Sequence, residues 1–106
     1  MKITSENFPW LLKAINFLRL DNDLRSTKSY TVKKSYKLYD VHSNNFKIIS
    51  FTEEDLARAN YALATLSEDD FEEFICGEAS FMEINSQYKY GLKVANSFLE
   101  AIFENS

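Results

Sequence analysis

Acidic side chains crowd residues 67–78, whose sequence is SEDDFEEFICGE. Paired carboxylates can hold a metal ion or act in general acid–base catalysis. However, the calcium-loop pattern D-x-[DN]-x-[DN]-G followed by a glutamate is missing from the chain. Catalytic carboxylates also usually converge in a cleft rather than on one exposed helical turn. We therefore expect neither a catalytic residue nor a metal site in this segment.

The chain has a single histidine, His42, and a single cysteine, Cys76. A zinc site needs several Cys or His ligands, so one of each argues against it. A Cys–His nucleophile pair requires contact between the two side chains, and nothing in the sequence brings them together. We expect His42 in a turn, and Cys76, which follows apolar Ile75, to be buried and inert.

Glycine-rich phosphate loops and the G-x-S-x-G nucleophile motif are also absent. We therefore expect no cofactor, and a protein that is not an enzyme.

Tyrosines and lysines alternate in residues 29–39, SYTVKKSYKLY. Aromatic rings can stack on bases while lysines neutralise phosphates, as in single-strand binders. The period-two pattern puts Lys33, Lys37 and Tyr39 on one face, which makes them alternative nucleic-acid-binding residues. The opposite face is expected to join the core and carries Tyr30, Val32, Tyr36 and Leu38. No motif of a named nucleic-acid-binding module is present.

Charge is segregated along the chain. Residues 24–51 carry six basic side chains and one acid, whereas residues 52–83 carry ten acids and one base. Two interpretations remain open. Acids near helix N-termini stabilise the helix dipole by about 0.3–1 kcal/mol each, and lysines protect an edge strand from pairing. Alternatively, an acidic helical face attracts a partner protein with a basic surface. The candidate partner-binding residues are Glu53, Glu54, Glu68, Asp69, Glu72 and Glu73.

Length and composition favour one domain over residues 1–106. The chain is 45% hydrophobic and 15% aromatic, with a net charge of -4. A uniform basic footprint for nucleic acid is therefore missing. No apolar run is long enough to span a bilayer, no signal peptide is recognisable, and one cysteine makes no internal disulfide. These features predict a cytoplasmic protein without a membrane segment.

The first half of the chain predicts a helix followed by a hairpin. Helical spacing of apolar residues over 5–23 indicates a helix that begins at Ser5 or Asn7, with Pro9 in its first turn. Its apolar stripe is broad, so we expect it at the centre of the core or against a partner. Alternation then indicates an antiparallel hairpin of 34–41 with 46–51, and leaves open a third strand near 29–33.

The second half predicts two or three helices. Thr52 and Asp55 resemble a capping box, and Ser67 starts the next helix in the same way. Gly77 occupies the position of a C′ glycine. A last helix is expected within 81–104, where Gly91 marks either close helix packing or a break. The predicted fold class is α+β.

The function favoured by these features is binding to another macromolecule through the acidic helical face. Small acidic domains without motifs are common among phage and mobile-element products that inhibit or adapt host machinery, and we extend that analogy here. Two alternatives remain. One is nucleic-acid binding through Lys33, Lys37 and Tyr39. The other is a structural role as a homodimer, through the first helix or an edge strand.

Overall fold

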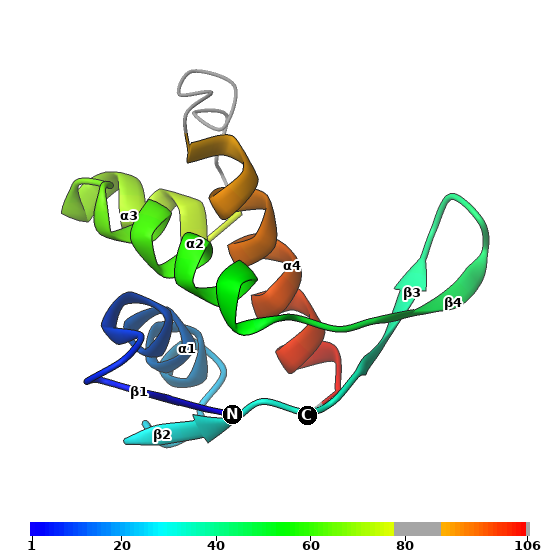
Figure 1. The fold of residues 1–106 in the computed structure, drawn as a ribbon, viewed down its shortest axis with the longest axis horizontal. Helices are drawn as coiled ribbons and strands as arrows, with labels where there is room; N and C mark the ends of the chain where they lie inside the picture. Colours follow the sequence, from blue (N-terminus) through cyan, green and yellow to red (C-terminus); the bar gives the residue numbers. More distant parts are fainter. Residues whose placement is uncertain (78–87, 106) are drawn as a thin grey trace.

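The computed structural model describes residues 1–77 and 88–105, which form an α+β fold (Figure 1). The elements are β1 (Lys2–Thr4), α1 (Pro9–Asp21), β2 (Ser29–Thr31), β3 (Tyr36–Asp40), β4 (Asn45–Ile49), α2 (Glu53–Ala64), α3 (Glu68–Ile75) and α4 (Lys89–Glu104). The predicted fold class, N-terminal helix, antiparallel hairpin and C-terminal helices are confirmed. The part of the last predicted helix before residue 88 lies outside the described residues.

The strands form two separate antiparallel pairs. In the first, β2 pairs with β1 over Lys2↔Thr31 to Thr4↔Ser29. The third strand left open by the sequence is therefore real, but its partner is the N-terminal segment rather than the hairpin. The second pair is the predicted hairpin, with β3 and β4 in register from Tyr36↔Ile49 to Asp40↔Asn45.

The start of α1 differs from the prediction. Its N-cap residue is Phe8, whose side chain makes no capping hydrogen bond, and Pro9 is the first helical residue. Asn7 is already engaged in the preceding turn, because its Oδ1 accepts from the Thr4 N–H at 2.7 Å and its Nδ2 donates to the Lys2 carbonyl at 2.8 Å. The predicted N-cap at Ser5 or Asn7 is therefore wrong.

A residue from another helix caps α1 instead. The Asn60 side chain, on α2, accepts the N–H of Trp10 at 2.8 Å and the N–H of Leu11 at 3.1 Å. Two of the N–H groups that lack a partner within the first turn of α1 are thus satisfied across the α1–α2 interface.

The other helix ends follow the sequence signals. Thr52 Oγ1 accepts from the Asp55 N–H at 3.1 Å and Asp55 accepts from the Thr52 N–H at 3.3 Å, so the capping box of α2 is complete. Ser67 Oγ accepts from the Asp70 N–H at 3.2 Å at the start of α3. Gly77 follows α3 with a φ of +83°, the left-handed conformation expected of a C′ glycine.

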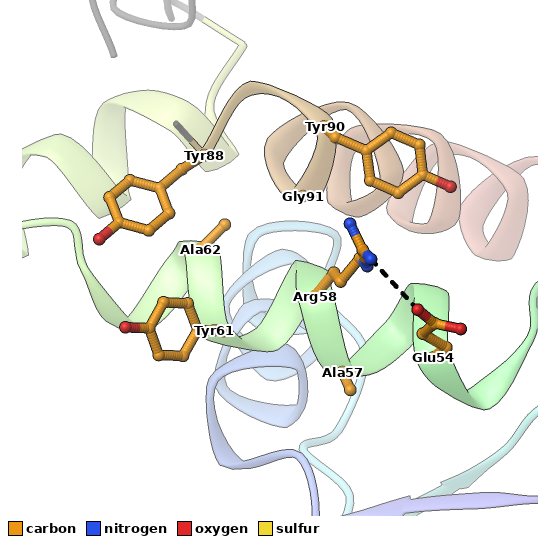
Figure 2. A pocket seen from close by; sticks show the side chains of 8 residues that line it. All are labelled: Glu54, Ala57, Arg58, Tyr61, Ala62, Tyr88, Tyr90 and Gly91. Carbon is orange, nitrogen blue, oxygen red and sulfur yellow. Dashed lines mark hydrogen bonds and ion pairs between the residues drawn. The ribbon is translucent and has the colours of Figure 1, made fainter. Parts of the chain in front are cut away.

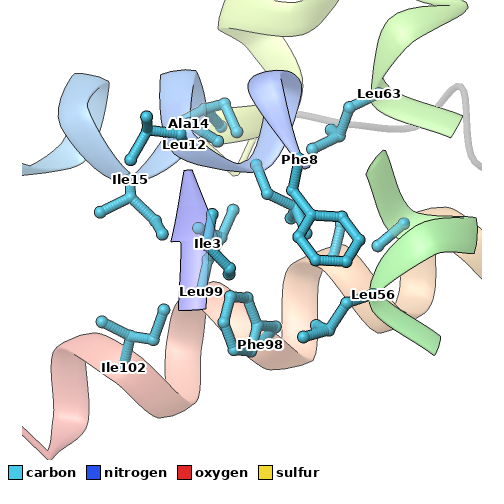
Figure 3. Packing of buried hydrophobic residues seen from close by; sticks show 14 of the residues in the cluster. Ile3, Phe8, Leu12, Ala14, Ile15, Leu56, Leu63, Phe98, Leu99 and Ile102 are labelled. Atoms are coloured by element: carbon cyan, nitrogen blue, oxygen red, sulfur yellow. The ribbon is translucent and has the colours of Figure 1, made fainter. Parts of the chain in front are cut away.

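One core joins both strand pairs to the helices. Figure 3 shows the part of it around Ile3 of β1, among side chains of α1, α2 and α4. Phe98 of α4 is fully buried, and its ring meets those of Tyr30, Tyr36 and Phe51 edge-on. The hydroxyls of Tyr30 and Tyr36 lie 2.8 Å apart, and burial and this hydrogen bond raise the pKa of Tyr30. Ile3 of β1 is also fully buried, between α1 and α4. In the described residues, no helix combines the length and apolar character needed to cross a membrane.

Candidate functional site

The β3–β4 hairpin exposes an apolar surface. Because side chains alternate along a strand, the register sends Tyr36 and Leu38 into the core and turns the pairs Lys37↔Ile48 and Tyr39↔Phe46 outward. Val41 follows in the turn. We call these residues the outer hairpin face: Lys37, Tyr39, Val41, Phe46 and Ile48. Val41 is 77% exposed, Ile48 70%, Phe46 54% and Tyr39 40%.

Side chains of the outer hairpin face contact one another. The rings of Tyr39 and Phe46 meet edge-on, with centroids 5.3 Å apart. Lys37 Nζ lies 4.5 Å from the centre of the Phe46 ring, a cation–π contact. The Tyr39 hydroxyl donates to Asn44 in the hairpin turn. The face is thus an ordered aromatic surface with one cation on it.

The hairpin projects from the helices and is attached mainly along β3 (Figure 1). At the end of α4, Asn105 Nδ2 donates to the Lys37 carbonyl at 2.9 Å, and Asn105 Oδ1 accepts from the Lys37 N–H at 3.4 Å. An amide side chain therefore covers part of the outer edge of β3. Beyond β4 no further strand is paired within residues 1–77 and 88–105.

The predicted nucleic-acid-binding residues are all exposed. Lys37 and Tyr39 share the outer hairpin face as predicted, whereas Lys33 precedes β3 and its Nζ donates to the Asn105 carbonyl at 3.4 Å. Sequence reasoning missed the cross-strand partners of these two residues, Phe46 opposite Tyr39 and Ile48 opposite Lys37. Side-chain alternation along the second strand of the hairpin would have predicted Phe46 and Ile48 on this face, once the turn between the strands was located.

The predicted acidic residues divide into two groups. Glu68, Asp69, Glu72 and Glu73 are exposed on α3, while Glu53 and Glu54 are exposed at the start of α2. Since α2 has 12 residues, about 18 Å of helix separates its start from the segment that leads into α3. Glu68 and Asp69, at the start of α3, therefore lie beyond the end of α2 that is opposite Glu53 and Glu54. Of the six acids, Glu54 alone forms an ion pair with a described residue, at 3.1 Å from Arg58.

A groove between α2 and the start of α4 is the second candidate site (Figure 2). It has a volume of about 410 Å³ and is lined by Glu54, Ala57, Arg58, Tyr61, Ala62, Tyr88, Tyr90 and Gly91. Gly91 lies beside the groove, at a point where the two helices pack closely. A Cβ built on Gly91 would lie 2.6 Å from the Arg58 carbonyl oxygen and 2.8 Å from the Ala62 Cβ. The close-packing alternative for Gly91 is thus confirmed.

Aromatic rings form the walls of this groove, which we call the tyrosine groove. The rings of Tyr61 and Tyr88 lie 5.8 Å apart on one side, and the Arg58 guanidinium lies 5.6 Å from the Tyr90 ring on the other. The Tyr90 hydroxyl donates to Asp55 at 2.8 Å. This hydrogen bond lowers the pKa of the Asp55 carboxyl and raises the pKa of the Tyr90 hydroxyl.

Cys76 does not lie where the sequence suggested. The prediction of a buried thiol is wrong, because Cys76 is the C-cap residue of α3 and is exposed as the chain turns toward Gly77. His42 is exposed in the hairpin turn, as predicted, and Figure 1 shows that turn apart from α3. The structure therefore does not form a Cys76–His42 pair.

The described part of the chain holds no group of three or more His, Cys, Asp or Glu residues placed to bind a metal ion. Comparison with known proteins found no matching family model, no similar curated protein and no similar solved structure.

Proposed function

We propose that this chain acts by binding another protein through the outer hairpin face. One observation carries the proposal: Tyr39, Val41, Phe46 and Ile48 are exposed together on one side of a projecting hairpin. Scattered exposed apolar residues are ordinary, but contiguous ones typically mark a protein interaction site. An adaptor or inhibitor in the cytoplasm, like the small products of phages and mobile elements, fits such a role.

The chemistry of the face favours a protein partner over nucleic acid. Val41 and Ile48 are its most exposed apolar members, and an aliphatic side chain offers no ring on which a base can stack. Lys37 pairs with Ile48 at the end of the face away from the turn, and Lys33, Lys34 and Lys47 are exposed nearby in the sequence. The fitting partner surface is therefore apolar with an acidic border.

The test is capture of partners from the source cell with the wild-type chain and with the double variant Phe46→Ser/Ile48→Thr. Both side chains are more than half exposed, so unfolding should change by less than about 0.5 kcal/mol per site. We expect one partner to disappear with the double variant and to remain with Leu20→Ser, which alters an exposed apolar side chain at the end of α1. A partner retained equally by both variants contradicts the proposal.

The acidic face of α3 is a second candidate. Glu68, Asp69, Glu72 and Glu73 are exposed and have no ion pair with a described residue, so their charge is available to a basic partner. Replacing the four by lysine should weaken that binding and reverse its salt dependence. Affinity that survives the replacement rules out the acidic face, and the hairpin variant serves as its control.

Two other functions are tested by separate measurements. Binding of single-stranded DNA or RNA at low salt that Lys37→Glu abolishes would favour nucleic acid. Concentration-dependent sedimentation that Ile48→Thr abolishes would favour a homodimer. The hairpin is the better surface for such a dimer, because α1 buries Leu11, Leu12, Ala14 and Ile15 within the chain.

A further inference from the structure

The tyrosine groove has a shallow floor and aromatic walls. Ala57, Ala62 and Gly91 contribute almost no side chain, whereas Tyr61 and Tyr90 stand 63% and 53% exposed above them. Tyr61 lies on α2, Tyr88 is the N-cap residue of α4 and Tyr90 lies in its first turn. The two helices pack closely at Gly91, so the fold holds the spacing of these rings (Figure 2). A ligand in this groove would lie against ring faces rather than enter a closed cavity.

Flat aromatic walls suit a chain in the polyproline II conformation. Such a chain has no internal hydrogen bonds, so its carbonyl oxygens are free to accept, and proline rings pack on aromatic faces with little loss of entropy. Tyr61 and Tyr88 offer two hydroxyl donors for these carbonyls, since neither hydroxyl bonds to a described residue.

Charge selects the end of the ligand that lies near the start of α2. Glu53, Glu54 and Asp55 form the first turn of α2 there, Arg58 pairs with Glu54, and Lys93 lies on the other side, in the hollow lined by Asp55 and Tyr90. The guanidinium of Arg58 already lies 5.6 Å from the Tyr90 ring and bonds to Glu54 at 3.1 Å. This end of the groove therefore holds one planar cation between an aromatic ring and a carboxylate. A second cation from a ligand would meet the remaining acids.

We infer that the tyrosine groove binds an extended, proline-rich peptide of a partner protein, with an arginine of that peptide at the Glu53–Asp55 end. The site is separate from the outer hairpin face. The variant Phe46→Ser/Ile48→Thr should therefore leave peptide binding intact, and failure of one site does not imply failure of the other.

The test is a titration of the ¹⁵N-labelled chain with the end-blocked peptide Arg-Pro-Leu-Pro-Pro-Leu-Pro, followed by amide chemical shifts. We expect saturation between about 10 μM and 1 mM, the range of weak peptide recognition, with the largest shifts in residues 54–62 and 88–91. Two further peptides complete the test, one with serine for every proline and one with glutamate for arginine. Both should bind at least about tenfold more weakly.

Tyr61→Ala is the decisive variant, and Tyr39→Ala on the hairpin is its matched control. Loss of Tyr61 should weaken binding about tenfold, as expected when an aromatic anchor is truncated, whereas Tyr39→Ala should leave it unchanged. The inference is overturned by any of three results: no shifts at about 1 mM peptide, equal binding of the serine peptide, or equal losses for the two tyrosine variants.

Discussion

At the scale of single residues, Asn60 joins two helices that are far apart in the sequence. Periodicity indicates its place on α2, but no local pattern reveals that its side chain accepts two N–H groups of α1. N-cap residues are normally sought just before the helix that they cap. Because Phe8 makes no capping hydrogen bond there, the start of α1 depends on this distant amide.

Replacement of Asn60 by alanine should therefore lower the free energy of unfolding by about 1–2 kcal/mol, the usual effect of losing a cap. The N–H groups of Trp10 and Leu11 would lose their acceptor at a partly buried site. Asn60→Asp keeps an acceptor and adds a negative charge near a helix N-terminus, so it should retain most of the stability. Urea unfolding followed by circular dichroism measures both, and equal losses would show that the amide does not act as a cap.

A second residue-scale prediction concerns pH. The Tyr90 hydroxyl holds the pKa of Asp55 below its ordinary value, with help from the capping bonds of Thr52. A carboxyl whose pKa is lower in the folded state stabilises the fold at pH values above its unfolded-state pKa of about 3.9. That stabilisation is lost as the pH falls through the folded-state pKa. The stability gap between the wild type and Asp55→Asn should therefore be full at neutral pH and narrow below about pH 4.

Tyr90→Phe provides the control for this pH dependence. It removes the hydroxyl that donates to Asp55 but keeps the ring beside Arg58. The pKa of Asp55, followed by NMR of its carboxyl carbon, should rise toward its ordinary value. An unchanged pKa would mean that capping alone accounts for the shift.

At the scale of elements, local patterns predicted what local chemistry determines. Thr52, Ser67 and Gly77 mark helix ends through hydrogen bonds or backbone conformation within a few residues, and these ends are confirmed. Strand β1 has three residues and shows no period, so its pairing with β2 follows from tertiary contacts. The exposure of Cys76 was missed because a residue that ends a helix faces whichever way the next turn leads.

The packing of α4 on α2 gives an element-scale prediction. Alanine normally stabilises a helix relative to glycine by about 1 kcal/mol. At Gly91 the added methyl would lie 2.6 Å from a backbone oxygen of α2, so the helices would have to separate. We expect Gly91→Ala to reduce stability by about 1–3 kcal/mol, as for other overpacked sites.

The matched control is Lys93→Ala, on the same helix but exposed, which should change stability by less than about 0.5 kcal/mol. Thermal or urea unfolding distinguishes the two. A Gly91→Ala variant more stable than the wild type would show that the α2–α4 contact adjusts freely, and the tyrosine groove would then lack a rigid floor.

At the scale of the whole molecule, the candidate sites differ in how many of their residues could be predicted from the sequence. Lys37 and Tyr39 were placed on one face by strand alternation alone, whereas adding Phe46 and Ile48 required the hairpin register. The tyrosine groove combines residues 54–62 with 88–91, and only the packing of two helices brings these segments together. A site that combines distant segments has no sequence motif. For this reason the sequence analysis favoured the acidic residues, whose clustering is visible along the chain.

The final prediction concerns cooperativity. The buried cluster includes Ile3 from the first strand pair and Leu38 from the hairpin, and both share it with α4. The Cα radius of gyration, 13.3 Å, is close to the value of about 13 Å for a single domain of 100 residues. Such a chain should unfold as one unit.

Two probes with different locations can test this. Trp10 fluorescence reports on the contact of α1 with α3, where the Trp10 and Phe71 rings lie 6.1 Å apart, and far-ultraviolet circular dichroism reports on all helices. Their urea midpoints should coincide in the wild type. Ile3→Ala and Leu38→Ala should each reduce the free energy of unfolding by about 2–5 kcal/mol, because both remove buried methyl groups from the same core. In each variant the two midpoints should fall together. A Leu38→Ala variant that leaves the Trp10 transition in place would show that the hairpin and α4 unfold apart from α1, and two cooperative units would then replace one.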